Sequence, residues 1–259
     1  MQIAGVFVHA ARVYPAAMTQ NIYDNPEFFE GYSRLPRSER GLAGAPEWAS
    51  LRAMLPEIAG LRVLDLGCGF GWFCRWAMEN SALSATGIDV SEKMLARAKA
   101  ESDPTIQYIQ ADMDRLNLVR GSYDLVYSSL AFHYLKNLNA LFGEIAGALA
   151  PGGRLVFSVE HPMVTAPRNP EWITTDGAKR WPVSDYLNDG ARETNWLAPG
   201  VIKQHRSMTT YINMLIANGL RLLHIEEWGP TDAQLAAQPS LGDERHRPNF
   251  LLVSAERAE

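Results

Sequence analysis

From residue 61 onward, short apolar runs alternate with segments whose apolar residues recur at helical spacing. A continuous apolar run of roughly four to eight residues favours a buried strand, whereas recurrence every three to four residues favours a helix. The expected strands cover 61–66, 82–89, 105–109, 123–128 and 154–159, and the expected helices cover 72–81, a segment capped by Ser91, and 138–150. Strands separated by helices in this order predict a parallel sheet with right-handed crossovers.

The segments on either side of this block have other patterns. Two helices are expected before it, over 26–32 and 46–55; after it, a helix capped by Ser207 is expected to end at Asn218, with strands over 220–226 and 249–255. Residues 161–200 have no clear period and are rich in Pro, Asn, Asp and Trp. A long irregular segment in a compact domain is usually a functional lid or a disordered stretch. Because tryptophans favour burial, we expect an ordered lid.

The composition is that of a globular protein with a mild acidic balance. Of the 259 residues, 47% are hydrophobic and 20% are charged, and the net charge is -5. This composition argues against disorder, and the acidic balance disfavours a nucleic-acid partner, because binding to phosphates usually needs a basic patch. No apolar run reaches the ~20 residues of a membrane span. The apolar start over 3–8 follows no basic region, so no signal peptide is predicted.

The two cysteines, Cys68 and Cys74, are expected to be reduced thiols in a cytoplasmic protein. They have no CxxC spacing and no metal-binding cluster is visible, so no metal site is predicted. Residues 1–17 differ in pattern from the rest, and Met18 precedes a polar segment that starts a helix. We therefore expect Met18 to be the functional start; N-terminal sequencing of the native protein checks this, and a fragment beginning at Met1 contradicts it.

The most specific motif is a glycine loop between the first expected strand and the helix that follows. The run VLDLGCGFG over 63–71 ends an apolar strand in an acid, Asp65, and continues through alternating glycines. Glycines at a strand-to-helix turn let a ligand approach the backbone. A second acid, Asp89, ends the next strand, where a carboxylate suits the two hydroxyls of a ribose. The pair predicts a site for a nucleoside-containing cofactor.

Two common nucleotide motifs do not match this loop. A dinucleotide fingerprint, Gly-x-Gly-x-x-Gly, needs its third glycine where this chain has Trp72, and Gly71 comes one residue early. A P-loop needs a Gly-Lys-Ser/Thr ending, which this loop lacks. An NAD-dependent oxidoreductase is therefore a disfavoured alternative.

The loop, with four further features, resembles motif I and its companions in the class I S-adenosylmethionine-dependent methyltransferases, of the small-molecule type with a methyltransferase domain 11 or 25. In chain order, the features are Asp65 with its glycines, Asp89, Asp112, the strand that starts Tyr123-Asp124, and the LAPGG turn over 149–153. The resemblance covers 61–160 closely. It implies an α/β, doubly wound, Rossmann-like sheet of seven strands, with an N-terminal helical cap and a long insertion after the fifth strand. The last strand, 249–255, is expected to be antiparallel and to lie beside the fifth.

The resemblance implies one methyltransferase domain over 1–259 and S-adenosylmethionine as its cofactor. Its parts are an extension and cap over 1–60, a cofactor-binding core over 61–160, a substrate lid over 161–206, and a C-terminal helix with strands over 207–259. Asp65 is expected to serve the ammonium of the methionine part, Asp89 the ribose, and Asp112 the adenine amino group. The other expected contacts come from Tyr32 and Arg34 at the methionine carboxylate, the backbone of Gly67 and Gly69, Met94, Met113, and Ser128 with Ser129 at the pocket floor. Asp89 and Asp112 have an alternative role as helix caps, and Asp124 is expected to be structural.

Methyl transfer from a sulfonium is an in-line displacement, so the protein mainly positions and desolvates the reactants. A protonated hydroxyl or amine acceptor also needs a base. The candidate catalytic residues are His133, after the fourth strand, and His161, after the fifth, with Tyr134 a weaker candidate. Both histidines have an alternative structural role, His133 in supporting the loop and His161 as a hinge or hydrogen-bonding residue. If His161 is the base, we expect His161→Ala to keep cofactor binding and to lower turnover.

The acceptor is expected to be a small molecule. Adenine and amide methylases carry Asn/Asp-Pro-Pro-aromatic after the fourth strand, where this chain has SSLAF over 128–132. The long insertion and the aromatic cap, with Phe28 and Phe29, indicate a closed pocket that excludes water. Its apolar or cation-binding walls are expected from Trp172, Trp181, Trp196 and Tyr186, for which anchoring of the loop is the alternative. The remaining functional alternative is a cofactor-binding or accessory protein without catalysis.

Overall fold

The computed structural model describes residues 19–258, so the expected start at Met18 lies outside the described part. The helices are α1 (Pro26–Ser33), α2 (Pro36–Glu39), α3 (Trp48–Met54), α4 (Trp72–Glu79), α5 (Glu92–Ala100), α6 (Leu138–Ala148), α7 (Pro162–Thr165), α8 (Met208–Ala217) and α9 (Asp232–Ala237), and the 3-10 turns are η1 (Ile22–Asp24), η2 (Gly41–Gly44), η3 (Met113–Arg115), η4 (Phe132–Tyr134) and η5 (Pro239–Arg245). The strands are β1 (Arg62–Leu66), β2 (Ser84–Asp89), β3 (Gln107–Gln110), β4 (Tyr123–Ser129), β5 (Leu149–Glu160), β6 (Ile173–Thr175), β7 (Ala178–Arg180), β8 (Gly190–Thr194), β9 (Val201–His205), β10 (Leu220–Trp228) and β11 (Phe250–Arg257).

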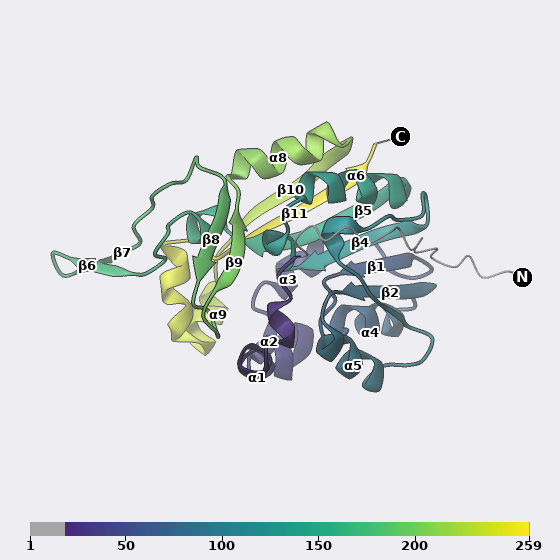
Figure 1. The fold of residues 1–259 in the computed structure, drawn as a ribbon, viewed down its shortest axis with the longest axis horizontal. Coiled ribbons are helices and arrows are strands. Elements are labelled where there is room, and N and C mark those ends of the chain that lie inside the picture. The colour runs from purple at the N-terminus through teal and green to yellow at the C-terminus, as the bar shows by residue number, and fades with distance from the viewer. Residues whose placement is uncertain (1–18, 259) are drawn as a thin grey trace, which may run out of the picture.

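Seven of the described strands form one sheet in the order β10-β11-β5-β4-β1-β2-β3 (Figure 1). The five strands from β3 to β5 in this order pair in parallel, whereas β11 is antiparallel to both β5 and β10. The expected seven-stranded, doubly wound sheet is confirmed, as is the last strand beside the fifth. The strand order reverses between β1 and β4, and open α/β sheets bind ligands at the carboxyl ends of strands beside such a reversal.

Helices cover both faces of the sheet (Figure 1). On one face lie α6 and α8, whose Phe142 and Leu215 belong to one large buried cluster. On the other lie α3, α4 and α5; there Phe73 of α4 stacks on Tyr127 of β4, with ring centroids 3.6 Å apart. Because both faces are covered, the central strands are buried on both sides, which explains their nearly continuous apolar sequence.

The fifth strand of the sheet begins earlier than the sequence indicates. It was expected over 154–159, after the LAPGG turn, but β5 already starts at Leu149, directly after α6. The turn lies inside the strand, where Gly152 has a φ of +73°. The register of β4 against β5 shifts between Tyr123 and Leu125, which accommodates the extra residues as a bulge does.

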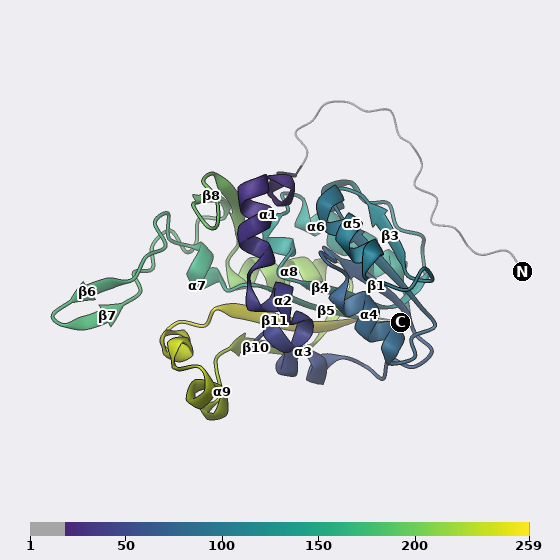
Figure 2. The same ribbon diagram turned by 90° about the horizontal axis from the view of Figure 1, so that it is seen from below.

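The segment 161–200, expected to be irregular, contains regular structure. Two antiparallel hairpins, β6–β7 and β8–β9, follow the short helix α7. In both ribbon views the β6–β7 hairpin projects away from the sheet (Figures 1 and 2). Its strands are short and fully exposed, so they lack the alternation of buried and exposed positions by which a strand is predicted.

The N-terminal helices contact the insertion directly. Phe28 of α1 is fully buried, and its ring lies 5.5 Å from Trp196. Tyr23 lies against both Phe28 and Tyr134, at 4.8 and 5.9 Å between ring centroids. The expected N-terminal helical cap is therefore present and packs on the insertion, although its second helix starts at Trp48 and α2 was not anticipated.

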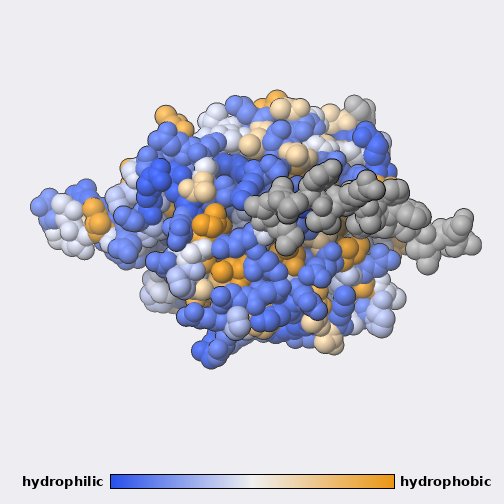
Figure 3. Space-filling view, viewed as in Figure 1, coloured by the Kyte–Doolittle hydropathy of each residue, from blue (hydrophilic) through white to orange (hydrophobic). Residues whose placement is uncertain are grey.

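The outer surface is mostly polar. The face in Figure 3 is mainly hydrophilic, with small, separate apolar patches. The most exposed large apolar side chains, Leu187 at 85% and Leu83 at 68%, belong to different segments. None of the helices in residues 19–258 has the length and apolar character needed to cross a membrane.

Candidate functional site

A large cavity of about 690 Å³ lies at the carboxyl ends of β1, β2, β4 and β5. Gly67 follows β1, and Asp89, Ser129 and Glu160 end the other three strands; all four residues line the cavity. The N-terminal segment and the insertion, defined as residues 161–206, line the remaining sides. One continuous cavity therefore joins the glycine loop to the insertion.

Backbone conformation shapes the part of the cavity around Gly67 and Gly69, called here the glycine end. Gly67, Gly69 and Gly71 have φ values of +76°, +51° and +76°, which side chains rarely allow. A Cβ at Gly67 would lie 2.3 Å from the Cβ of Ala131, and one at Gly71 would lie 2.1 Å from the Tyr108 hydroxyl. A Cβ at Gly69 would meet no described atom within 4 Å. Gly67 and Gly71 thus allow close packing, and Gly69 leaves open space for a ligand.

Asp89 ends β2 and lines the glycine end. One carboxylate oxygen accepts from the Gly69 N–H at 2.9 Å, and the other accepts from the Ser91 N–H at 2.9 Å. Burial raises the pKa of Asp89, and these two donors oppose the rise. The cap of α5 is Ser91, whose Oγ accepts from the Met94 N–H at 3.1 Å. Each Asp89 oxygen keeps a lone pair with which it can accept from one hydroxyl of a ribose.

A smaller cavity of about 80 Å³ adjoins the glycine end, and Asp65 lines it. The two cavities share Tyr32, Arg37, Gly67, Gly69 and Ser129. Burial, and then the neighbouring Asp89, raise the pKa of Asp65 to about 8. The Cys74 thiol donates to Asp65 Oδ2 at 3.7 Å, and both cysteines are free and buried. A cation that entered this cavity would favour the ionised form of Asp65.

Donors for an anion line the same small cavity. Trp72 Nε1 is buried and has no hydrogen-bond partner among residues 19–258. Arg37 binds both carboxylate oxygens of the buried Glu47 through Nη2, at 2.7 and 3.0 Å. Arg34, expected at the methionine carboxylate, is instead exposed and pairs with Glu30. Arg37, three residues later, lines both cavities.

Both methionines expected at the cofactor line the large cavity; Met94 is 1% and Met113 is 8% exposed. Asp112 lies next to Met113, but it is not among the described residues that line the cavity. Its carboxylate accepts from the Thr19 hydroxyl at 2.7 Å and the Thr19 N–H at 3.2 Å, and it caps η3. The structure thus places Asp112 as a cap and as an anchor for Thr19, which itself lines the cavity.

The pocket-floor expectation is corrected from two serines to one. Ser129 lines both cavities. Ser128 is fully buried, and its Oγ donates to the Leu66 carbonyl at 2.7 Å, which ties β4 to β1. Successive side chains of a strand point to opposite faces, so the two serines cannot share one role. Asp124 pairs with Arg62 at 2.8 Å, the structural role expected for it.

His133 lines the large cavity and is 2% exposed. Burial lowers its pKa to about 4, so the ring is neutral at neutral pH. Its Nδ1 accepts from the Glu160 N–H at 3.4 Å. A neutral ring that accepts at Nδ1 carries its proton on Nε2. His133 therefore presents a donor, and not a base, through its other nitrogen.

His161 lies outside the cavity walls found among the described residues, and both of its ring nitrogens are engaged. Nδ1 accepts from the Met163 N–H at 3.1 Å and so caps α7, while Nε2 lies 2.9 Å from a carboxylate oxygen of Glu227. Burial lowers the pKa of His161, and the neighbouring Glu227 carboxylate opposes this shift. The expectation of a base at His161 is corrected: the side chain fixes the start of the insertion against β10.

The insertion end of the cavity, lined by the insertion and Arg247, contains a buried ion pair. Lys203 Nζ lies 2.6 Å from Glu160 Oε1 and 5.0 Å from the centroid of the Trp196 ring. Burial alone would raise the pKa of Glu160, but Lys203 and then His133 lower it below its usual value. Glu160 is therefore a paired carboxylate and a weak base.

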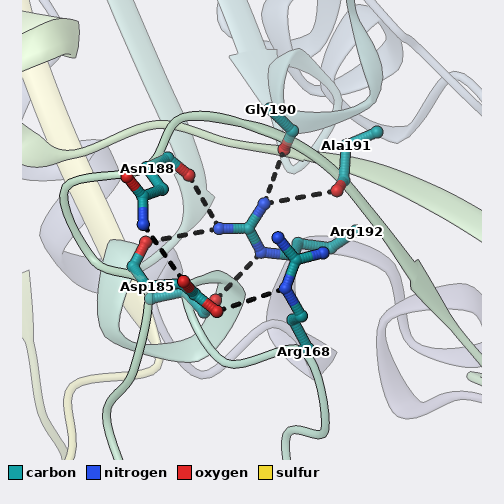
Figure 4. Close-up of polar contacts among 7 residues, drawn as sticks. Arg168, Asp185, Asn188, Gly190, Ala191 and Arg192 are labelled. Carbon is teal, nitrogen blue, oxygen red and sulfur yellow. Dashed lines mark hydrogen bonds and ion pairs between the residues drawn. The ribbon is translucent and has the colours of Figure 1, made fainter.

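Arg192 holds separate parts of the insertion together by hydrogen bonds to their backbone carbonyls (Figure 4). Its guanidinium donates to the carbonyls of Ala166, Asp185, Asn188, Gly190 and Ala191, at 2.8 to 3.4 Å. Arg168 donates to the Asp185 carboxylate at 3.2 Å beside it. Arg192 is 5% exposed, and burial, followed by repulsion from Arg168, lowers its pKa. All five of its N–H donors are used, so Arg192 acts as a scaffold.

The tryptophan faces in the cavity are covered by the chain's own cations. The Arg247 guanidinium lies 4.2 Å from the Trp181 centroid and 5.4 Å from that of Trp172. Lys203 covers Trp196, as described above. The cation-binding walls expected for a substrate are therefore occupied, and the tryptophans serve to hold basic side chains.

Sequence reasoning missed three residues that matter here: Arg37, Arg192 and Arg247. Each was a lone arginine without a motif around it. The Arg192 acceptors include Ala166, 26 positions away, and the ring against Arg247 is Trp181, which the chain brings near only after the insertion has folded. The one signal available was the Arg-x-x-Arg spacing of Arg34 and Arg37 in the cap.

Comparisons with known proteins decide the family. A family model described as a methyltransferase domain matches residues 64–157, which span the glycine loop and Asp89. The crystal structure of an S-adenosylmethionine-dependent methyltransferase from Mesorhizobium loti is 54% identical, with a TM-score of 0.81, and the match covers 84% of this chain and all of that one. The chain belongs to the S-adenosylmethionine-dependent methyltransferases.

Two sequence relatives of this methyltransferase differ in the share of each chain that the alignment covers. An uncharacterized protein of Haemophilus influenzae is 31% identical over 92% of this chain and 98% of its own length. A trans-aconitate 2-methyltransferase of Deinococcus radiodurans is 34% identical over 127 residues, 46% of this chain and 48% of that relative. The match to the enzyme with a stated acceptor thus covers about half of its length.

The residues of this methyltransferase fit its cofactor, S-adenosylmethionine. The open space at Gly69, the donors around Asp89 and the unpartnered indole N–H of Trp72 lie along two adjoining cavities. An acid at the far end, Asp65, complements an ammonium. Within residues 19–258, no cluster of three or more His, Cys, Asp or Glu side chains could hold a metal ion.

Proposed function

We propose that this methyltransferase transfers the methyl group of S-adenosylmethionine to a small-molecule acceptor held between the glycine loop and the insertion. The observation that carries the proposal is the single cavity of about 690 Å³ that runs from Gly67 and Asp89 to Trp181 and Arg247. Its volume lies in the range of small-ligand sites. One relative is named for methyl transfer to trans-aconitate, which supports a small acceptor.

The residues proposed to hold the cofactor follow from the two cavities. Asp65 would accept from the ammonium and Arg37 with Trp72 would donate to the carboxylate of the methionine part, beside Tyr32. Asp89 would accept from the ribose hydroxyls, and Met94 with Met113 would contact the adenine. The backbone of Gly67 and Gly69 would lie along the cofactor. When bound, it supplies an electrophilic methyl group on a sulfonium.

The remaining side chains act on the acceptor. His133 would donate from Nε2 to an acceptor oxygen, and the N-terminal helices with the insertion would exclude water. We also propose that the chain acts as one domain, because the cap and the insertion line a single cavity with the sheet. Action on nucleic acid is not proposed: the net charge is -5.

Calorimetric titration with S-adenosylhomocysteine, the product form of the cofactor, tests this proposal. We expect micromolar binding and no measurable binding of NAD. Asp89→Asn should weaken binding by about tenfold or more, because a charged acceptor is lost at a buried site. Asp124→Asn is the matched control, since Asp124 pairs with Arg62. NAD binding, or equal affinity of both variants, contradicts the proposal.

A further inference from the structure

The insertion end of the cavity contains more buried cations than buried anions. Lys203 at 5% and Arg247 at 6% exposure both line it, and each pairs with a half-buried carboxylate, Glu160 at 2.6 Å and Glu244 at 3.0 Å. Glu171 and Glu193 also line the cavity but are exposed. An incoming ligand therefore meets two basic side chains at this end, each of which already has one carboxylate partner.

Arg247 lines the cavity and has one donor without a partner in the described chain. Nη2 donates to both carboxylate oxygens of Glu244, at 3.2 and 3.0 Å, and to Asn249 Oδ1 at 3.2 Å. Nε is buried and has no partner in the described chain. The stack on Trp181 keeps the guanidinium plane in place. A buried N–H left unpaired costs free energy, so a fixed arginine with a free donor favours an acceptor that supplies an oxygen.

The half-buried and buried side chains at this end of the cavity that could serve as bases are already engaged, and the carboxylates of Glu171 and Glu193 are exposed. Nδ1 of His133 already accepts a hydrogen bond, so its Nε2 carries the proton. Glu160 is bound by Lys203, and the hydroxyls of Tyr23 and Tyr134 lie 3.5 Å apart, with burial raising the pKa of both tyrosines. None of these described side chains can readily take a proton from a neutral hydroxyl. An acceptor that is already ionised needs no such step.

We propose, on the basis of the function proposed above, that the acceptor is a carboxylic acid, bound at the insertion end by Arg247 and Lys203 and methylated on a carboxylate oxygen. The acceptor oxygen forms the new C–O bond while the C–S bond of the sulfonium breaks, and the electron pair of that bond stays on sulfur. The product is a methyl ester and a thioether. No proton is released, because the carboxylate is already ionised.

A set of three probes of one shape tests the charge preference. Benzoate, benzamide and benzylamine carry a negative, a neutral and a positive group on the same ring. Their binding to the protein saturated with S-adenosylhomocysteine is measured by ligand-observed NMR titration. We expect benzoate to bind about tenfold or more tightly than benzamide, as a charge-assisted hydrogen bond allows, and benzylamine to bind most weakly. Benzoate binding no tighter than either of the other two overturns the proposal.

Three variants locate the preference. Arg247→Gln should reduce the advantage of benzoate over benzamide to about twofold or less, and Arg247→Lys should keep part of it, because it keeps the charge. Arg245→Gln is the matched control: Arg245 lies two residues away, is exposed and pairs with Asp232. S-adenosylhomocysteine affinity should be unchanged in all three, which shows that each is folded. An unchanged benzoate preference in Arg247→Gln overturns the assignment to Arg247.

The chemistry of the product tests the step itself. Tritiated methyl groups from S-adenosylmethionine should enter an equimolar mixture of small aliphatic and aromatic acids and be released by alkali as methanol. Label that survives alkali, or that enters none of the acids, overturns the proposal. Failure of S-adenosylhomocysteine to bind would instead contradict the proposed function, so the two failures are distinguishable.

Discussion

At the glycine end of the cavity, the groups that face a ligand are backbone atoms and strand-end carboxylates, and the partners of Asp89 lie 2 and 20 residues away. Asp89 is held by the N–H groups of Gly69 and Ser91. At the insertion end, the ligand-facing groups are long side chains held by remote partners. Arg247 lies on Trp181, and Lys203 pairs with Glu160, 43 residues away. One cavity therefore has a short-range end and a long-range end.

This difference indicates which end can vary. Backbone shape at Gly67 is constrained by Ala131, so most changes there disturb the fold. The insertion end is carried by two hairpins and a short helix outside the seven-stranded sheet, so its side chains can change without altering the strand order (Figure 2). Loops placed on a rigid scaffold commonly carry specificity in this way. With the function proposed above, the sheet would hold the methyl donor, and the insertion together with Arg247 would hold the acceptor.

The largest expected effect is the loss of S-adenosylhomocysteine binding after a change at the glycine end. Gly67→Ala should abolish S-adenosylhomocysteine binding, a loss of about a hundredfold or more, because the new Cβ would lie 2.3 Å from Ala131. Gly60→Ala is the control: its φ of +78° matches the +76° of Gly67, but nothing lies within 4 Å. Both should lose about 1–2 kcal/mol of unfolding free energy from the left-handed backbone, and Gly67→Ala should lose more, because its Cβ overlaps Ala131. Calorimetry and denaturant unfolding measure both quantities, and similar affinity losses in the two variants contradict the explanation.

A change at Arg192 should loosen the insertion end and leave the glycine end intact. Arg192→Ala leaves five carbonyls without their donor. Unsatisfied buried groups cost about 1–3 kcal/mol each, although water would reach some of these carbonyls. We expect amide hydrogen exchange over 166–192 to become about a hundredfold faster, with S-adenosylhomocysteine affinity unchanged. Arg168→Ala, at an exposed arginine, is the control; equal exchange in both variants would show that Arg192 does not hold the insertion.

The sequence predicts the glycine end better than the insertion end, because the glycine end depends more on local sequence patterns. The glycine loop, Asp89 and the cap at Ser91 are local patterns, and the structure contains each of them. The parallel sheet followed from alternating strands and helices, and its seven strands with an antiparallel last strand followed from the family resemblance. β5 begins earlier than predicted because the LAPGG turn, whose sequence is typical of a break before a strand, forms a bulge inside the strand. Local spacing and period therefore determine most of the sheet.

Two site assignments that the structure does not support, Asp112 at the cavity and His161 as a base, involve contacts distant in sequence. Asp112 is bound by Thr19, 93 residues away, and His161 by Glu227, 66 residues away. Neither partner carries a local signal. The β6–β7 hairpin is exposed throughout, so no hydrophobic period marks it. Ser128 points into the sheet and Ser129 lines the cavity, a difference in side-chain direction that the sequence motif does not show.

The smallest expected effect concerns proton release at the glycine end on cofactor binding. Burial raises the pKa of Asp65 to about 8, so the free protein holds this carboxyl protonated at neutral pH. An ammonium bound beside it favours the ionised form, so binding releases a proton. The affinity for S-adenosylhomocysteine should therefore rise with pH between about 6 and 8, by at most about tenfold per pH unit, and level off above that range.

Calorimetry in buffers of different ionisation enthalpy measures the released proton directly. Asp65→Asn should remove both the proton release and the pH dependence, and should weaken binding at pH 8 because the charge partner of the ammonium is lost. Asp124→Asn, at a carboxylate already paired with Arg62, should keep the slope of the wild type. An affinity that is constant or falls from pH 6 to 8 would show that Asp65 does not meet the ammonium. The methionine part would then depend on Arg37 and Trp72, and the glycine end would rely on distant side chains as the insertion end does.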